Sequence, residues 1–147
     1  MPDELLRPTI GASVDMSARP WRSMSQTYVA FFGGVIATTV IAFLNARRLG
    51  VGPDKRRLIL ALGAAGMVLS AAVIRLLATD DSSGLRVAIR AVAVACCLLQ
   101  LRLQRPMDRA FQLRGSDYGS LWGPGLAAVF GCGLLEVVLL AAVAGAL

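Results

Sequence analysis

Residues 126–147 read LAAVFGCGLLEVVLLAAVAGAL, a run of 22 residues in which Glu136 is the single charged side chain. A helix needs about 20 apolar residues to cross the hydrocarbon layer of a bilayer, so this stretch predicts a membrane-spanning helix. The whole chain of 147 residues has the same character, with 56% apolar and 16% charged residues. Soluble domains average roughly 45–50% apolar and about 25% charged residues. The sequence therefore excludes an ordinary soluble fold and predicts an integral membrane protein.

Three other apolar stretches precede this one, over residues 27–46, 58–78 and 85–103. Arg90 and Gln100 interrupt the third stretch, but the consecutive apolar residues 91–99 offset the cost of inserting the arginine. An interfacial aromatic belt is expected from the residues that flank the first and fourth stretches, which are Trp21, Tyr28, Tyr118 and Trp122. We therefore predict an all-α, polytopic membrane protein. It is a four-transmembrane-helix bundle over residues 27–147, preceded by a polar N-terminal segment over residues 1–26.

Most of the basic residues lie in two links between the predicted spans, whereas the link around Asp80 and Asp81 is acidic. Because basic links stay on the cytoplasmic side, both termini are expected on the extracytoplasmic face of a bacterial plasma membrane. The same links are expected to contact anionic lipid head groups. Their basic residues are Arg47, Arg48, Lys55, Arg56 and Arg57 in the first link and Arg105, Arg109 and Arg114 in the third. No nucleic-acid-reading module accompanies this charge, so nucleic acid is not an expected partner.

Glu136 is the residue in these spans that points most directly to function. It lies about ten residues into its span, which at 1.5 Å per residue is near the bilayer midplane. Acids at that depth face protein or water and mark functional sites by default. We expect Arg90 to reach Glu136, with Arg75 near the outer end of the second span as a second candidate. Three interpretations remain open: an ion pair that fixes helix register, a gated or proton-coupled polar pathway, and an interface to a partner membrane protein.

Polar and small residues in the third span repeat in alternating steps of four and three. At 100° per residue they stay on one face of a helix, and such a stripe turns toward protein in a membrane. The stripe comprises Arg86, Arg90, Ala93, Cys97, Gln100 and Gln104.

The first span carries small residues at four-residue spacing, a pattern that lets helix backbones approach closely. Shorter versions occur in the second and fourth spans. The predicted helix-packing residues are Ala30, Gly34, Thr38, Ala42, Gly66, Ser70 and Gly133. Packing within the bundle and docking of a second copy or a partner are both compatible with this pattern.

Several classes of chemistry have no support in the sequence. The chain has no histidine, which excludes His-based catalysis and His-ligated metal. Its cysteines, Cys96, Cys97 and Cys132, lie inside predicted spans without the spacing of metal ligands. Phosphate-binding loops, nucleophile elbows and paired carboxylates within the bundle are missing from the sequence. We therefore predict no metal, no cofactor and no catalytic residue.

Two functional interpretations follow from these patterns, and an enzyme acting on a lipid or isoprenoid is a third. The leading one is a non-catalytic integral membrane subunit or adaptor of a larger bacterial membrane assembly. It would bind another membrane protein, or a second copy, through the small-residue face or the polar stripe. The alternative is a small oligomeric transporter or channel that uses Glu136 and the polar stripe.

Residues 28–34 read YVAFFGG, and residues 45–50 read NARRLG. Together they resemble a pattern in uncharacterised small multi-span membrane proteins of bacteria, in which a span begins with an FFGG-type sequence and ends in Asn-x-Arg-Arg-Leu-Gly. The resemblance covers residues 28–50. It implies a multi-span membrane protein of bacterial origin and no particular activity.

Overall fold

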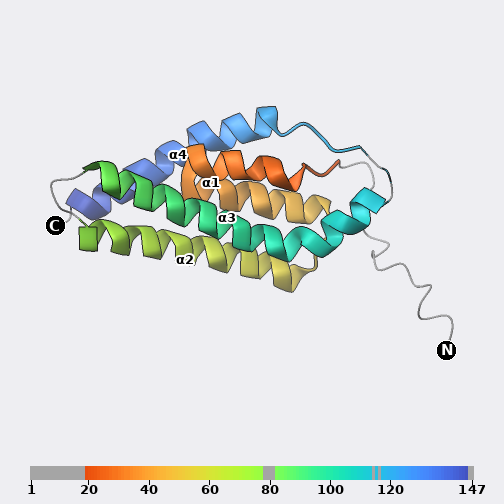
Figure 1. Ribbon diagram of the computed structural model, residues 1–147, viewed down its shortest axis with the longest axis horizontal. Coiled ribbons are helices and arrows are strands. Elements are labelled where there is room, and N and C mark those ends of the chain that lie inside the picture. The colour runs from red at the N-terminus through yellow and green to blue at the C-terminus, as the bar shows by residue number, and fades with distance from the viewer. Residues whose placement is uncertain (1–18, 78–81, 114, 116, 146–147) are drawn as a thin grey trace.

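The protein is described by a computed structural model that covers residues 19–77, 82–113, 115 and 117–145. Four long helices make up this part of the chain (Figure 1): α1 (Gln26–Arg48), α2 (Pro53–Leu77), α3 (Ser82–Leu113) and α4 (Trp122–Gly145). A short 3-10 helix, η1 (Ser23–Ser25), precedes α1. By residue number and apolar composition alone, all four long helices are long and apolar enough to cross a membrane. The predicted all-α membrane protein with a four-helix bundle is therefore confirmed.

The third helix is longer than its predicted span. Its 32 residues extend to Leu113 and include Pro106. At 1.5 Å per residue it is about 48 Å long, which exceeds a hydrocarbon layer of about 30 Å. Arg105 and Arg109, expected in a link, lie instead on the helical extension of α3, because its Arg, Gln and Met residues favour helix. Arg114 lies outside the described residues.

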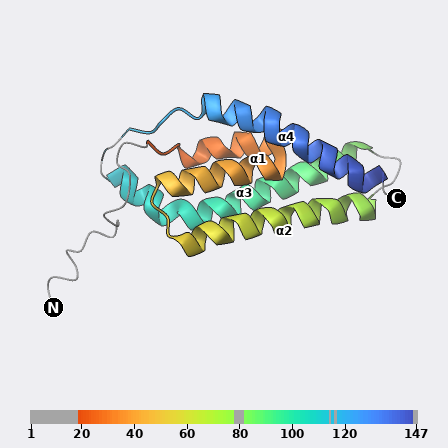
Figure 2. The same cartoon turned by 180° about the vertical axis from the view of Figure 1, so that it is seen from behind.

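The first helix folds back on itself at Gly34. This residue has φ 82° and ψ −163°, a backbone conformation that only glycine adopts readily. A first arm (residues 26–33) and a second arm (residues 35–48) therefore run side by side in opposite directions (Figures 1 and 2). The backbone N–H of Trp21 donates to Asn45 Oδ1 at 2.7 Å. In a continuous helix these two residues, 24 positions apart, would be separated by about 36 Å.

The return of α1 places both of its ends at one end of the bundle. We call this the basic end; it holds residues 19–25, the link from α1 to α2, and the C-terminal part of α3. The Gly119 N–H donates to the Pro20 carbonyl there at 2.8 Å. α2 runs from the basic end to the opposite, far end, α3 returns, and α4 runs to the far end again (Figure 2). Arg19 and Gly145 therefore lie at opposite ends, whereas a straight first span would place them at the same end.

The hairpin of α1 packs mainly against α3 and α4 and supplies more buried residues than any other helix. The small residues of α1 that were predicted to mediate helix packing lie inside this core, namely Ala30, Gly34, Thr38 and Ala42. Gly66 of α2 faces Val35, and Gly133 of α4 faces the backbone of Gly33. Ser70 is also fully buried. The structure thus places all seven small residues at contacts within the bundle.

Candidate functional site at the break in α1

Glu136 binds the start of the second arm of α1. Its side chain is 4% exposed, and its Oε2 accepts a hydrogen bond from the backbone N–H of Ile36 at 2.7 Å. The first N–H groups of a helix have no intrahelical acceptor, and the helix dipole makes this terminus partly positive. A carboxylate from α4 therefore caps a helix start that lies inside the bundle.

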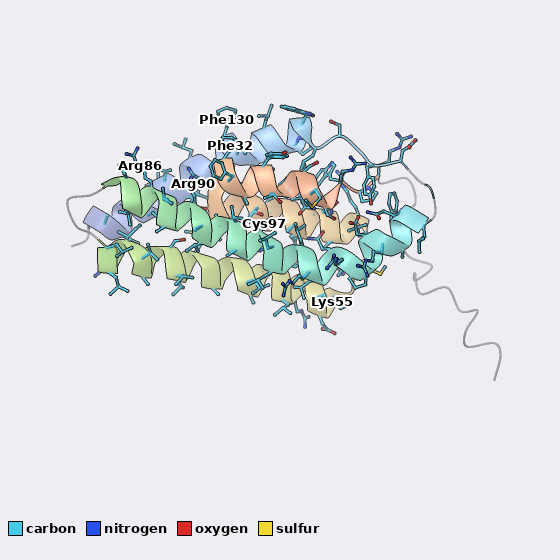
Figure 3. The ribbon with its side chains drawn as sticks, in the orientation of Figure 1. Phe32, Lys55, Arg86, Arg90, Cys97 and Phe130 are labelled. Atoms are coloured by element: carbon cyan, nitrogen blue, oxygen red, sulfur yellow. The ribbon has the colours of Figure 1, made fainter. Side chains whose placement is uncertain are left out.

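Arg90 binds the end of the first arm. Its Nη1 donates to the carbonyl oxygen of Phe32 at 3.2 Å, and Figure 3 shows it extending from α3 toward this part of α1. The last carbonyl groups of a helix lack intrahelical donors and form its partly negative terminus. The cation and the anion therefore each lie at the helix terminus of opposite sign, on the two sides of one break.

This arrangement differs from the direct contact that we expected between Arg90 and Glu136. In the described part of the chain, both side chains hydrogen-bond to the backbone of α1, with no salt bridge between them. The reason is that a break inside an apolar bundle leaves backbone donors and acceptors that water does not satisfy. Arg75, the second candidate partner, is exposed in the last turn of α2.

Two glycines permit this close approach. A Cβ atom at Gly34 would fall on the carboxyl group of Glu136, so the acid occupies the space of the missing side chain. A Cβ atom at Gly33 would meet the backbone of Val129 on α4 at 3.0 Å. The FFGG sequence therefore supplies both the sharp turn and the room for the capping acid.

A row of polar contacts leads from the break toward the basic end. Gln100 of α3 is fully buried, and its Nε2 donates to Thr39 Oγ1 at 2.9 Å and to the Ile59 carbonyl at 3.2 Å. The hydroxyl of Thr39 donates in turn to the Val35 carbonyl at 2.7 Å. Gln100 thereby ties α3 to the second arm of α1 and to α2.

The next contacts in the row lie at the basic end. Asn45 Nδ2 donates to Oε1 of the buried Gln104 at 3.0 Å, and Asn45 Oδ1 accepts the Trp21 N–H. Nearer the break, the buried Cys97 lies beside Thr38 and Thr27. We call the row formed by Asn45, Gln104, Gln100, Thr39, Thr38 and Cys97 the polar seam.

The seam contains the half of the predicted stripe that lies nearer the basic end. Cys97, Gln100 and Gln104 face α1, as expected for a polar face in a membrane. Arg86 is exposed on the side of α3 that carries Arg90, nearer the far end (Figure 3). The stripe is thus buried beside the hairpin and exposed beyond its tip.

Several buried polar atoms of the bundle have no hydrogen-bond partner among the described residues. They include, on the seam, Thr38 Oγ1, Gln100 Oε1 and Gln104 Nε2, and elsewhere both amide atoms of Gln26 and Ser70 Oγ on α2. Buried polar groups are nearly always paired, with protein or with ordered water. Water bridges of this kind need polar partners on several sides, which a line of amides and hydroxyls supplies.

The basic end carries a second cluster, which the sequence pattern did not reveal. Asp108 of α3 is 8% exposed and accepts hydrogen bonds from Ser23 Oγ and from the Tyr118 hydroxyl, both at 2.8 Å. Burial, followed by the hydrogen bond to Asp108, raises the pKa of Tyr118 above its ordinary value of 10. Trp21, expected in an interfacial belt, is 2% exposed beneath the guanidinium of Arg48, whose carbon is 3.9 Å from the ring centre.

Comparison with protein families, characterised proteins and solved structures finds no match to this chain. Within the described residues, no three His, Cys, Asp or Glu side chains are grouped so that they could hold a metal ion. The site is therefore interpreted from its own groups: one carboxylate, one guanidinium, and a hydrogen-bonding seam.

Proposed function

We propose that the protein is a small proton-conducting membrane protein in which Glu136 takes up and releases the proton. The observation that carries this proposal is the position of Glu136, at a helix break inside the bundle and at the inner end of a polar seam. Transporters place their sites at such breaks, where half-helix termini and irregular backbone meet near the midplane. Intramembrane acids also mark proton relays.

The chemistry of the seam favours the proton over a larger solute. Gln100 contacts Thr39 at 2.9 Å, and Asn45 contacts Gln104 at 3.0 Å, so neither pair leaves room for a hydrated ion between its side chains. A proton needs only hydrogen-bonded groups and bridging water. The unpaired buried atoms of the seam are groups that such water would satisfy. Glu136 is the one acidic residue of the described chain that lies away from the basic end.

The surfaces on which the adaptor interpretation depends are not exposed for a partner. The small-residue face of α1 and the stripe residues Cys97, Gln100 and Gln104 of α3 are buried within the bundle. A partner cannot dock on these faces without opening the hairpin. The enzyme interpretation has no second acid, base or nucleophile hydrogen-bonded to Glu136 among the described residues.

We also propose that the basic end faces the cytoplasm of a bacterial cell. The positive-inside rule applies to this end, where Arg22, Arg47 and Arg57 are exposed. Because α1 enters and leaves at the basic end, Arg19 then lies on the cytoplasmic side and Gly145 on the extracytoplasmic side. This replaces the expectation that both termini lie outside. Alkaline phosphatase fused after Gly145 should be active, and fused before Arg19 it should be inactive.

Anionic lipid head groups are the proposed partners of this end. Its exposed cations lie on three separate segments, which the hairpin brings to one side of the bundle. They are Arg19 and Arg22 before α1, Arg47, Lys55 and Arg57 around the first link, and Arg102, Arg105 and Arg109 on α3. Each cation near an anionic surface contributes about 1 kcal/mol of attraction.

The test of proton conduction uses the full chain in liposomes that enclose a pH-sensitive dye. A potassium gradient with valinomycin sets the membrane potential that drives protons. The protein should dissipate the potential by proton entry, and Glu136→Gln should abolish this flux. The Gln side chain keeps an oxygen for the Ile36 N–H, so the hairpin should remain folded. Asp117→Asn is the matched control, because Asp117 is exposed at the basic end. Wild-type flux equal to that of empty liposomes, or unchanged flux in Glu136→Gln, would overturn the proposal.

A further inference from the structure

Residues 19–25 cross the basic end of the bundle, and we call them the N-terminal strap. The strap contacts three other segments. The Arg19 carbonyl accepts from Arg48 Nη1 at 3.1 Å, and the Pro20 carbonyl accepts from the Gly119 N–H at 2.8 Å. Ser23 Oγ donates to Asp108 at 2.8 Å. The strap is therefore fixed to α1, to α3 and to the segment that leads into α4.

Trp21 is the part of the strap that lies on the polar seam. Its backbone N–H binds Asn45 Oδ1, while the other side-chain atom of Asn45 binds Gln104. The indole is 2% exposed, with the Arg48 guanidinium over its ring and Val29, Ala37, Ile41 and Ala128 in the same apolar cluster. The residue that binds the outermost residue of the seam through its backbone thus carries a large, buried ring.

The contacts outside this ring are mainly polar. The strap carbonyls, the Ser23 hydroxyl and the Arg22 guanidinium, which lies 5.9 Å from the Tyr118 ring centre, all bind groups near the basic surface. Water can replace such partners, so segments held this way open locally at lower free energy than the helices unfold. The exposed Arg19 and Arg22 stay hydrated whether the strap is bound to the bundle or released from it.

We propose that the N-terminal strap is a gate on the seam, with Trp21 as its plug, and that the structure represents the closed state. This proposal rests on the proposed function, because the gate controls access from the basic side to the seam and to Glu136. Opening moves Trp21 away from Asn45 and exchanges the strap contacts for water. Asn45 and Gln104 then meet solvent, and the seam becomes continuous with the basic side.

Gln104→Cys provides a reporter thiol for this gate. Gln104 is fully buried at the basic end of the seam, where its Oε1 accepts from Asn45 Nδ2 at 3.0 Å. When the three native cysteines, Cys96, Cys97 and Cys132, are replaced by Ala, Gln104→Cys supplies the single thiol. A charged, membrane-impermeant methanethiosulfonate added from the basic side of oriented vesicles should modify this thiol slowly. Trp21→Ala should raise the modification rate at least tenfold, whereas Trp122→Ala should not change it, because Trp122 is 78% exposed.

A second variant separates gating from misfolding. Ser23→Ala removes one strap contact to Asp108 and keeps the plug, so we expect a rise of about threefold, intermediate between wild type and Trp21→Ala. Ser23→Ala should keep the wild-type melting temperature in detergent within a few degrees, whereas Trp21→Ala should lower it, because it removes a buried ring from an apolar cluster. Equal modification rates in wild type and in both strap variants would overturn the gate.

The modification rate is independent of proton flux. Faster labelling in Trp21→Ala together with no flux in any variant would support the gate and reject proton conduction. Normal flux that depends on Glu136, with labelling unaffected by the strap variants, would reject the gate alone.

Discussion

Glu136 occupies the space that a side chain at residue 34 would fill, so the capping acid and the glycine are complementary parts of one turn. The acid binds the Ile36 N–H two residues beyond this glycine. The turn thus depends on the absence of a side chain in α1 and on the presence of a carboxylate in α4.

Gly34→Ala should therefore destabilise the protein. The positive φ of residue 34 costs a non-glycine residue about 1–3 kcal/mol, and the added Cβ displaces the Glu136 carboxyl group. A lower melting temperature in detergent would show this. Gly131→Ala is the matched control, because a Cβ there meets nothing within 4 Å. It should leave the melting temperature unchanged or slightly raised, and equal effects of the two substitutions would contradict the hairpin.

Substitutions at Glu136 should separate capping from proton transfer. Glu136→Leu leaves the Ile36 N–H unpaired inside the bundle, which costs about 1–3 kcal/mol of stability. Glu136→Gln keeps an acceptor and should lose flux with a smaller loss of stability. Melting temperatures of both variants, measured beside liposome flux, check this. If Glu136→Gln were as unstable as Glu136→Leu, the negative charge of Glu136, and not only its hydrogen-bond acceptor, would be needed to stabilise the break in α1.

Gln100→Leu tests whether the seam is also a structural element. It removes the donor to Thr39 and to the Ile59 carbonyl, and about 1–3 kcal/mol of stability should be lost. Proton flux should fall as well, since the row of polar groups is interrupted. Arg105→Leu, on the exposed extension of α3, should change stability by about 0.5 kcal/mol or less. Full flux in Gln100→Leu would place the proton path elsewhere.

Tyr118 should show a pH dependence of its own. Its pKa is raised in the folded state, so the neutral phenol is favoured there and stabilises the fold below the ordinary pKa of 10. This contribution is lost as the pH rises through the folded pKa. Phenolate absorbance near 295 nm, compared between wild type and Tyr118→Phe, should place this deprotonation above pH 10. A difference spectrum that titrates below pH 10 would contradict the buried contact with Asp108.

The bundle itself could be predicted from the sequence because hydropathy depends on local composition. The inward face of α3 could also be predicted, since Gln100 and Gln104 repeat with the period of a helix. The turn at Gly34 could not. Its four-residue spacing with Ala30 and Thr38 fits a straight helix equally well, and the acid that selects the broken form is remote in sequence.

The burial of Trp21 could not be predicted from the sequence, for a similar reason. Aromatic residues beside apolar stretches commonly lie in the membrane interface, and Trp21 has this position in the sequence. Its actual surroundings come from Arg48 and Asn45, which reach it only because α1 returns. One backbone turn therefore determines both the orientation of the N-terminal strap and the environment of its largest side chain.

The separation of 100 residues between Ile36 and Glu136 also sets an order of assembly. Ribosomes add about 5–20 residues per second, so roughly 5–20 seconds pass between synthesis of the break and synthesis of its cap. During that time the hairpin lacks its carboxylate cap and all of its packing surface on α4. The hairpin of α1 thus reaches its final conformation only after α4 has been made, and a truncated chain that ends before α4 is an immature form.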